Sequence, residues 1–416
     1  MVAGPPGEGA RNMQIVKPSE AVDLARNKRL LNRYRYIEYE TLRILAAWLP
    51  ATARMEYKLA MGRFLWEEAQ HVQHLYQRLR EVQTPAFRPP EDAALEKLMT
   101  EAIHAPDEGS LLAGLHRVIK PALLEAYRWH SQQTFANPDA PTLYALKHIL
   151  LDEAEHVAWA EAEFAAQPVS DWERYLERLL AQAGGITGAE PRAEKPAPPA
   201  TRKAFHTPMT AARDERFQIL QRHWGDAEAR RQSDAAARRL DEFENYSQEM
   251  LAAETVALII HLSPNMPWGF VYDSARHCYD ETRHCKLGID WLWQHGLDHT
   301  AVPQNTRIYQ WRSQFDAATQ YCLLTRGNEA HAFPHRRRSL AQYTAAGDAL
   351  SAQYVSYDMA DERQHVAYGT KWLPELMAQN NIAMPVEDFI AETIALWQRE
   401  YVSGDLTLRD EREEIS

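Results

Sequence analysis

Four short segments of this 416-residue chain repeat one pattern, in which an acidic residue is followed by a glutamate, two variable residues and a histidine. They occupy residues 67–71, 152–156, 280–284 and 361–365. Because residues i and i+3 of an α-helix lie on one face about one turn apart, the glutamate and histidine of each segment can reach the same cation. The pattern therefore predicts four helices that each carry such a pair.

A Glu-x-x-His match without the preceding acid occurs at Glu101 and His104, close to Pro106 and Gly109. The surrounding residues are typical of a turn, so we interpret this match as a chance occurrence. The four acidic segments differ because apolar or aromatic residues adjoin them, and charged side chains in apolar surroundings are costly unless they are paired or bound to metal. The competing interpretation is that they form solvated faces of ordinary amphipathic helices.

A segment rich in glycine, proline and small residues, 184–205, divides the chain nearly in half. Its composition favours an extended, solvated linker. We therefore expect four parts: a disordered N-terminus at 1–17, a helical domain at 18–183, the linker, and a second helical domain at 206–416.

Long stretches of Ala, Leu, Glu, Arg and Gln at helical spacing predict an all-α fold, with breaks at proline and glycine. The expected helices are 18–49, 52–83, 109–135, 139–166 and 169–183 in the first half, and 210–263, 268–296, 305–332, 336–379 and 386–402 in the second. The first helix of the second half is expected to break near Gly225, and Pro334 is expected to separate two helices.

Each half also contains two solitary glutamates that alternate with its two Glu-His pairs. The same order in both halves predicts one four-helix unit repeated in tandem. Four glutamates and two histidines form the donor set of a di-metal site inside a helix bundle, because iron and manganese favour carboxylate oxygen and imidazole nitrogen. The predicted ligands are Glu40, Glu68, His71, Glu125, Glu153 and His156 in the first half, and Glu254, Glu281, His284, Glu329, Glu362 and His365 in the second.

The acidic residue in front of each motif has a separate predicted role. A metal-bound histidine usually donates its second N–H to a carboxylate, which fixes the tautomer of the ring. We expect Glu67, Asp152, Asp280 and Asp361 to accept these hydrogen bonds, each from the histidine of the partner motif across the bundle. Glu67 departs from the pattern by its longer side chain, and the alternative is that all four acids coat the helix surface.

Neighbouring residues compete with some of these assignments. Glu38 competes with Glu40, and Glu249 competes with Glu254. His277 lies one turn before the third motif and could reach the second site, although a core histidine is the simpler interpretation. The three cysteines are too few for a disulfide framework, and we expect them to be buried free thiols.

The composition argues against two classes of partner. With 45% hydrophobic and 25% charged residues the chain is typical of a globular protein, and its net charge of −12 offers no basic surface for nucleic acid. No apolar run approaches the ~20 residues needed to span a bilayer. We expect a cytoplasmic protein without nucleic-acid or membrane partners, and its oligomeric state stays open between a monomeric pseudo-dimer and a homodimer.

The motifs resemble those of the ferritin-like superfamily of di-iron carboxylate proteins. Residues 280–284, Asp-Glu-Thr-Arg-His, resemble the DExRH motif of its bacterial multicomponent monooxygenases. The resemblance covers both halves and rests on short motifs and their spacing. It implies two tandem ferritin-like four-helix bundles with about two iron ions per site and about four per chain, or manganese in their place.

This resemblance implies an O₂-activating di-iron oxygenase or oxidase that acts on a small organic substrate, with an electron donor as a further potential partner. No catalytic residue beyond the metal ligands can be identified. The aromatic candidates for lining a substrate pocket are Trp268, Phe270, Tyr272, Tyr279, Trp291 and Trp293. The alternatives are a ferroxidase, peroxidase or manganese-catalase-like protein without an organic substrate, and a structural protein that keeps one metal site for stability.

Overall fold

The computed structural model describes residues 21–85, 87, 89–220, 234–404 and 406–408. Within these ranges the chain is all-helical, as predicted, and its one pairing of extended backbone is an isolated bridge between Ile219 and Gln304. The expected disordered segment 1–17 and the expected break near Gly225 lie outside the described residues. In the part of the chain described, every helix is too short or too polar to cross a membrane.

The first half contains seven α-helices and one π-helix among its described residues. They are α1 (Leu24–Trp48), α2 (Met55–Glu81), α3 (Ala93–Ala102), α4 (Glu108–Gly114), the π-helix η1 (Leu115–Ile119), α5 (Lys120–Gln133), α6 (Ala140–Glu163) and α7 (Asp171–Gln182). The helices expected from the sequence are present, and α3 is an additional one. It begins where Asp92 accepts hydrogen bonds from the backbone N–H groups of Ala94 and Leu95.

Among the described residues, the second half begins with two short helices where the first half begins with one long helix. Its described helices are α9 (Ala235–Tyr246), α10 (Met250–Leu262), α11 (Trp268–Gln294), the 3₁₀ turn η2 (His299–Ala301), α12 (Arg307–Arg312), α13 (Ala317–Cys322), the π-helix η3 (Leu323–Glu329), α14 (Ala330–Ala346), α15 (Ala349–Gln379), α16 (Val386–Leu396) and the π-helix η4 (Trp397–Val402). The expected break at Pro334 is wrong, because this proline lies inside α14. The break falls at Gly347, whose positive φ of 73° ends that helix.

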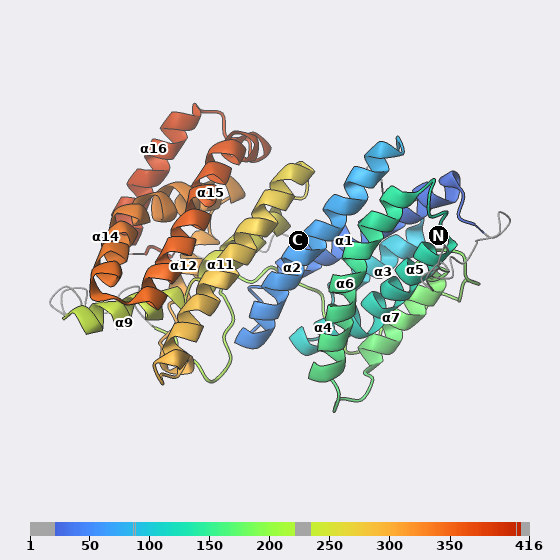
Figure 1. The fold of residues 1–416 in the computed structure, drawn as a ribbon, viewed down its shortest axis with the longest axis horizontal. Coiled ribbons are helices and arrows are strands. Elements are labelled where there is room, and N and C mark those ends of the chain that lie inside the picture. The colour runs from blue at the N-terminus through green and yellow to red at the C-terminus, as the bar shows by residue number, and fades with distance from the viewer. Residues whose placement is uncertain (1–20, 86, 88, 221–233, 405, 409–416) are drawn as a thin grey trace, which may run out of the picture.

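The two halves pack directly against each other, and α2 and α11 lie side by side where they meet (Figure 1). The largest cluster of buried apolar side chains contains residues of both halves, and smaller clusters lie in the second half. The approach is close at Gly62 of α2, where a Cβ atom would lie 2.1 Å from Oγ1 of Thr282. A buried ion pair between Lys58 of α2 and Glu254 of α10, 2.5 Å from Nζ to Oε1, also joins the halves.

The segment 184–205 contains no helix or strand: it begins with turns, continues as irregular backbone and is anchored to the first half. Nε of Arg33 donates to the carbonyl oxygen of Ile186 at 2.8 Å. Arg202 pairs with Glu101 at 2.6 Å, and the backbone N–H of Phe205 donates to Nδ1 of His104 at 3.0 Å. The fifth Glu-x-x-His match therefore holds this segment in place and lies away from the other four motifs.

Candidate metal centre

The four Glu-His motifs lie on buried helical faces that meet in two pairs. The first two motifs are on α2 and α6, and the last two are on α11 and α15. All four motif glutamates and all four motif histidines are at most 2% exposed. The ring centroids of His71 and His156 are 6.0 Å apart, and the same distance separates His284 and His365.

The acidic residue of each motif contacts the histidine of the facing motif, as expected from the sequence. The Nε2 atoms lie 3.3 Å from Asp152 for His71, 2.7 Å from Glu67 for His156, 3.3 Å from Asp361 for His284 and 3.4 Å from Asp280 for His365. Glu67 makes the shortest of these contacts, so its longer side chain is no obstacle. With Nε2 engaged, Nδ1 of each ring is left to face the glutamates.

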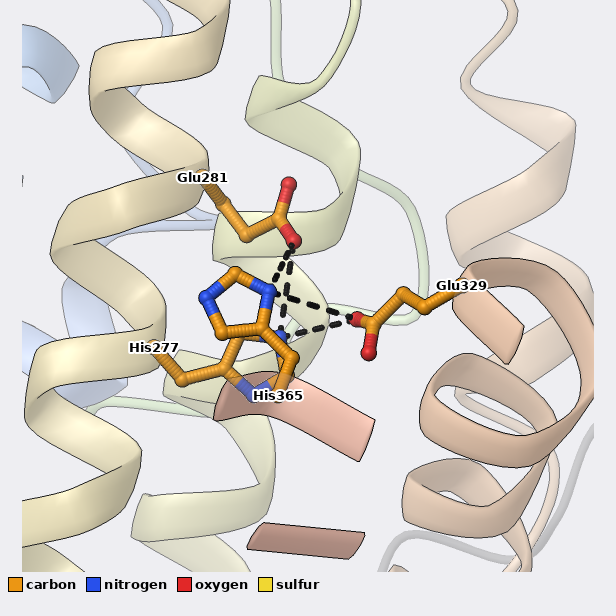
Figure 2. Close-up of side chains that lie close together, drawn as sticks. All are labelled: His277, Glu281, Glu329 and His365. Carbon is orange, nitrogen blue, oxygen red and sulfur yellow. Dashed lines mark hydrogen bonds and ion pairs between the residues drawn. The ribbon is translucent and has the colours of Figure 1, made fainter. Parts of the chain in front are cut away.

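In the second half, one group of possible ligands consists of His277, Glu281, Glu329 and His365, whose ligand atoms all lie within 4.8 Å of one another. Figure 2 shows these four side chains converging from α11, η3 and α15. Oε1 of Glu281 is 3.3 Å from Nδ1 of His365 and 3.4 Å from Nε2 of His277. His277, which the sequence left as an alternative, is thus part of the site.

A second group of possible ligands shares Glu281 with the first. Nδ1 of His284 lies 3.3 Å from Glu249, 3.5 Å from Asp358 and 3.7 Å from Oε2 of Glu281. Glu281 therefore directs one carboxylate oxygen toward each group, and Glu362 adjoins both, 3.6 Å from Nδ1 of His365. We call the combined set the second-half cluster: Glu249, His277, Glu281, His284, Glu329, Asp358, Glu362 and His365.

Several buried donor atoms in this cluster make no hydrogen bond to any described residue. They include Oε1 of Glu281, Oε2 of Glu329, Oε2 of Glu362, and Nδ1 of His284 and His365. A buried polar atom without a partner usually costs about 1–3 kcal/mol, so several in one place call for an explanation. Carboxylate oxygens and imidazole nitrogens gathered in this way suit iron or manganese.

The titration of the cluster reflects the crowding of its charges. Burial would raise the pKa of Glu281, but contacts with the surrounding histidines hold it well below its usual range. Burial would lower the pKa values of His284 and His365, but the neighbouring carboxylates raise both well above the usual value. Burial raises the pKa of Asp358 well above its usual value. The cluster therefore holds protons that a bound cation would displace.

The first-half cluster has a different centre. Its residues are Glu38, Glu68, His71, Lys120, Glu153 and His156. Nζ of Lys120 lies 2.7 Å from Glu38 and 2.5 Å from both Glu68 and Glu153. Burial would lower the pKa of Lys120, but these carboxylates raise it well above its usual value, so the side chain is a fixed cation. A divalent cation placed among the same carboxylates would be repelled by the positive charge of Lys120.

The predicted ligands Glu40 and Glu125 are not brought to the first-half cluster. Glu38 takes the place of Glu40, because it shares the buried face of α1 with Tyr34 and Leu45. Glu125 lies on the outer face of α5, where it pairs with Arg128 at 2.6 Å and its side chain is 70% exposed. The predicted six-ligand set of the first half is therefore not assembled.

The predicted ligand Glu254 is likewise absent from the second-half cluster. It is fully buried, but it pairs with Lys58 and Arg213 at the contact between the halves. Glu249 takes its place because the chain turns between α9 and α10, and Glu249 lies at the first residue before α10. The sequence placed the break of the span 210–263 near Gly225, so the turn before Glu249 was not expected.

Two positions distinguish the halves; the sequence left one of them, His277, as an alternative and gave no role to the other, Asp358. Four residues before the motif glutamates, the first half has Phe64 and Ile149, whereas the second half has His277 and Asp358. The centroid of the Phe64 ring lies 4.4 Å from that of His156, and the centroid of the His277 ring lies 3.8 Å from that of His365. The i−4 spacing was a usable signal, because it places each side chain one turn from its motif on the same face.

Lys120 was also missed, although the spacing could have identified it. It precedes Glu153 by 33 residues, and Glu329 precedes Glu362 by the same number. Lys120 directly follows a π-helix, and Glu329 ends one. A π-helix has more residues per turn than an α-helix, so it rotates the side chains that follow it relative to constant α-helical spacing. Constant spacing therefore indicated Glu125.

A cavity of about 330 Å³ adjoins the second-half cluster. Four carboxylates of the cluster line it: Glu249, Glu281, Glu329 and Glu362. Its aromatic wall consists of Trp397 and Tyr401 from η4, and none of the six aromatic residues proposed from the sequence lines it. Those residues lie elsewhere; for example, Phe270 is in the main core.

The fold and site define an all-helical protein with buried carboxylate and histidine clusters of a kind that can bind metal. A family model described as "Protein of unknown function (DUF455)" matches residues 187–410, which is more than half of the chain. The chain belongs to the DUF455 family. No match was found among curated proteins or among solved structures. All eight residues of the second-half cluster lie within the matched range, whereas the first-half cluster lies outside it.

Proposed function

We propose that this protein is a non-haem di-iron oxidoreductase that activates O₂ at the second-half cluster and oxidises a small organic substrate. In this proposal each half is a ferritin-like helical bundle, and the second half alone holds metal. The observation that carries the proposal is the sharing of Glu281. Its two oxygens face two different ligand groups, as a carboxylate that bridges two cations must.

The donor set fits two iron ions. One would be held by His277, Glu329 and His365, and the other by Glu249, His284 and Asp358, with Glu281 and Glu362 adjoining both. Two bound ferrous ions would supply the electrons for O₂ reduction. Manganese has similar ligand preferences and is the alternative metal.

The residues around the cluster have separate roles in this proposal. Asp361 and Asp280 accept hydrogen bonds from Nε2 of His284 and His365, which keeps Nδ1 of both rings available for metal. Arg336 pairs with Asp358, Glu249 and Glu362, so it offsets part of the negative charge that remains. The adjoining cavity gives an organic substrate room beside the metals.

Anaerobic titration with Fe(II) tests the proposal, and we expect saturation at about two ions per chain. The count of about four implied by two equivalent sites would mean that Lys120 does not replace metal in the first half. Failure to bind would refute the metal centre itself. In air, oxidation of only the bound iron would support an oxygenase that awaits its substrate, whereas continued oxidation of excess Fe(II) would favour a ferroxidase.

A further prediction concerns the acid that orients His284. Replacing Asp361 with asparagine keeps the shape of the side chain but removes the carboxylate that contacts Nε2. We expect metal affinity to fall by about 10–100-fold, as is typical for such partners. Competition with a coloured chelator would measure it. Asp290→Asn is a matched control on α11, because Asp290 pairs only with Lys286 among the described residues, and equal affinities of the two variants would contradict the assigned role.

A further inference from the structure

The cavity beside the second-half cluster has two chemically different sides. One side consists of the cluster carboxylates. The other is formed by α12, η3 and η4 and combines apolar side chains with Asn328 and one cation, Arg312, the last residue of α12. Polar residues of α9 and α14, among them Asp241, Glu244 and Arg336, complete the lining. At about 330 Å³ the cavity is near the lower end of the ~300–1,000 Å³ common for small-molecule sites.

Arg312 is a buried guanidinium without an ion pair to any described residue. It is only 3% exposed, and its Nε atom has no hydrogen-bond partner among these residues. Burial lowers its pKa below the usual value, against the opposing influence of Tyr401, Glu329 and Glu281. An uncompensated buried charge is costly, by several kcal/mol in typical proteins.

Three other arginines with buried side chains are paired. Arg336 contacts three carboxylates, Arg33 pairs with Asp92 at 2.6 Å, and Arg213 pairs with Glu254 at 2.6 Å. Arg312 differs from these because it lines a cavity large enough for a ligand but has no ion pair to a described residue. Its missing partner is therefore expected to be a molecule that enters the cavity.

The surroundings of Arg312 indicate the chemistry of that molecule. Its guanidinium carbon lies 6.0 Å from the centre of the Tyr401 ring, and Ile308, Leu324 and Trp397 provide apolar lining nearby. One guanidinium can balance one negative charge, and the cluster carboxylates would repel further ones. This favours a singly charged carboxylate with an apolar body over a phosphate.

We propose that the cavity binds a small organic carboxylate, with its carboxylate against Arg312 and its apolar part beside the second-half cluster. The bidentate geometry of guanidinium and carboxylate would fix the ligand's orientation. The proposal that a carboxylate binds here depends only on the cavity and on Arg312. The conclusion that this molecule is the substrate to be oxidised rests on the proposed function.

Isothermal titration calorimetry with benzoate and hexanoate tests the binding. Benzamide and hexanamide are the controls, because they are uncharged analogues of similar shape. In the manganese-loaded protein we expect at least one carboxylate to bind about tenfold or more tightly than its amide. Arg312→Gln should abolish this preference. Arg307→Gln on the same helix is the control, because Arg307 does not line the cavity, and it should behave as the unmodified protein.

Three results would overturn the proposal: equal binding of acid and amide, no binding of any of the four probes, or a preference that survives in Arg312→Gln. Thermal unfolding adds a readout that separates a ligand site from a structural counterion. Without ligand, Arg312→Gln should be at least as stable as the unmodified protein, because it removes an unpaired buried charge. A clear loss of stability would instead show that Arg312 serves to balance the cluster.

The same titration in the metal-depleted Glu281→Ala variant separates this proposal from the di-iron proposal. Because this variant is expected to bind no metal, carboxylate binding that depends on Arg312 in it would support the carboxylate site independently of the di-iron centre. In the unmodified protein, carboxylate binding without uptake of Fe(II) or Mn(II) would support the carboxylate site and refute the di-iron centre. Metal binding without any carboxylate preference would do the reverse.

Discussion

Replacing Glu281 with alanine is expected to remove both metal ions, leaving well below about one ion per chain. The reason is that the two oxygens of this carboxylate face two separate ligand groups. Glu329→Ala should have a smaller effect, with about one ion retained, because Glu329 contacts only the group that contains His277 and His365. Metal analysis after loading and desalting would measure both.

Glu375→Ala provides the control for these variants, since Glu375 is exposed on α15 and should leave the metal content unchanged. Circular dichroism would show whether each variant keeps its helices. If folded Glu281→Ala retained one ion, the carboxylate would serve a single site and the bridging assignment would be wrong. If it retained both, the second-half cluster would not be the metal centre.

Replacing Lys120 with methionine is expected to cause the largest loss of stability. Methionine has a similar length but leaves Glu38, Glu68 and Glu153 buried without their cation. Removing one partner from a buried charge cluster typically costs about 3–5 kcal/mol, which corresponds to a fall in Tm of roughly 10 °C for a domain of this size. Thermal unfolding followed by circular dichroism would measure it.

Lys147→Met is the matched control, because Lys147 is exposed on α6 and its loss should change Tm little. Equal Tm values for the two variants would contradict the role given to Lys120. Lys120→Glu places a carboxylate at the position that corresponds to Glu329 of the second half. This variant should be stabilised by Mn²⁺ more than the unmodified protein is, and no such difference would argue against the correspondence of the two positions.

Much of the fold could be predicted because helix formation is largely a local property. Apolar spacing and proline positions located α2, α6 and α11 to within a few residues of their ends. The contacts between the outer acids and the facing histidines were also predictable, since the side chains of each motif lie on one helical face.

The solitary residues were harder to predict, because their position depends on helix phase over many turns. Glu38 and Glu40 are two residues apart and point in different directions, and only the buried face of α1 decides between them. The π-helices and the turn before α10 change the phase where Lys120 and Glu249 lie. Constant spacing could not follow these changes.

The sequence alone determined that the chain forms long helices with four buried Glu-His pairs, because this information lies within a few residues of each motif. Only the tertiary structure decided which charge occupies each centre. It brings Lys120 into one cluster and His277, Asp358 and Glu249 into the other, so that similar motifs surround an ammonium group in the first half and additional carboxylates and an imidazole in the second. The physical reason is that residues far apart in the chain meet only through packing, and in a buried site each charge must be balanced by whatever the packing places beside it.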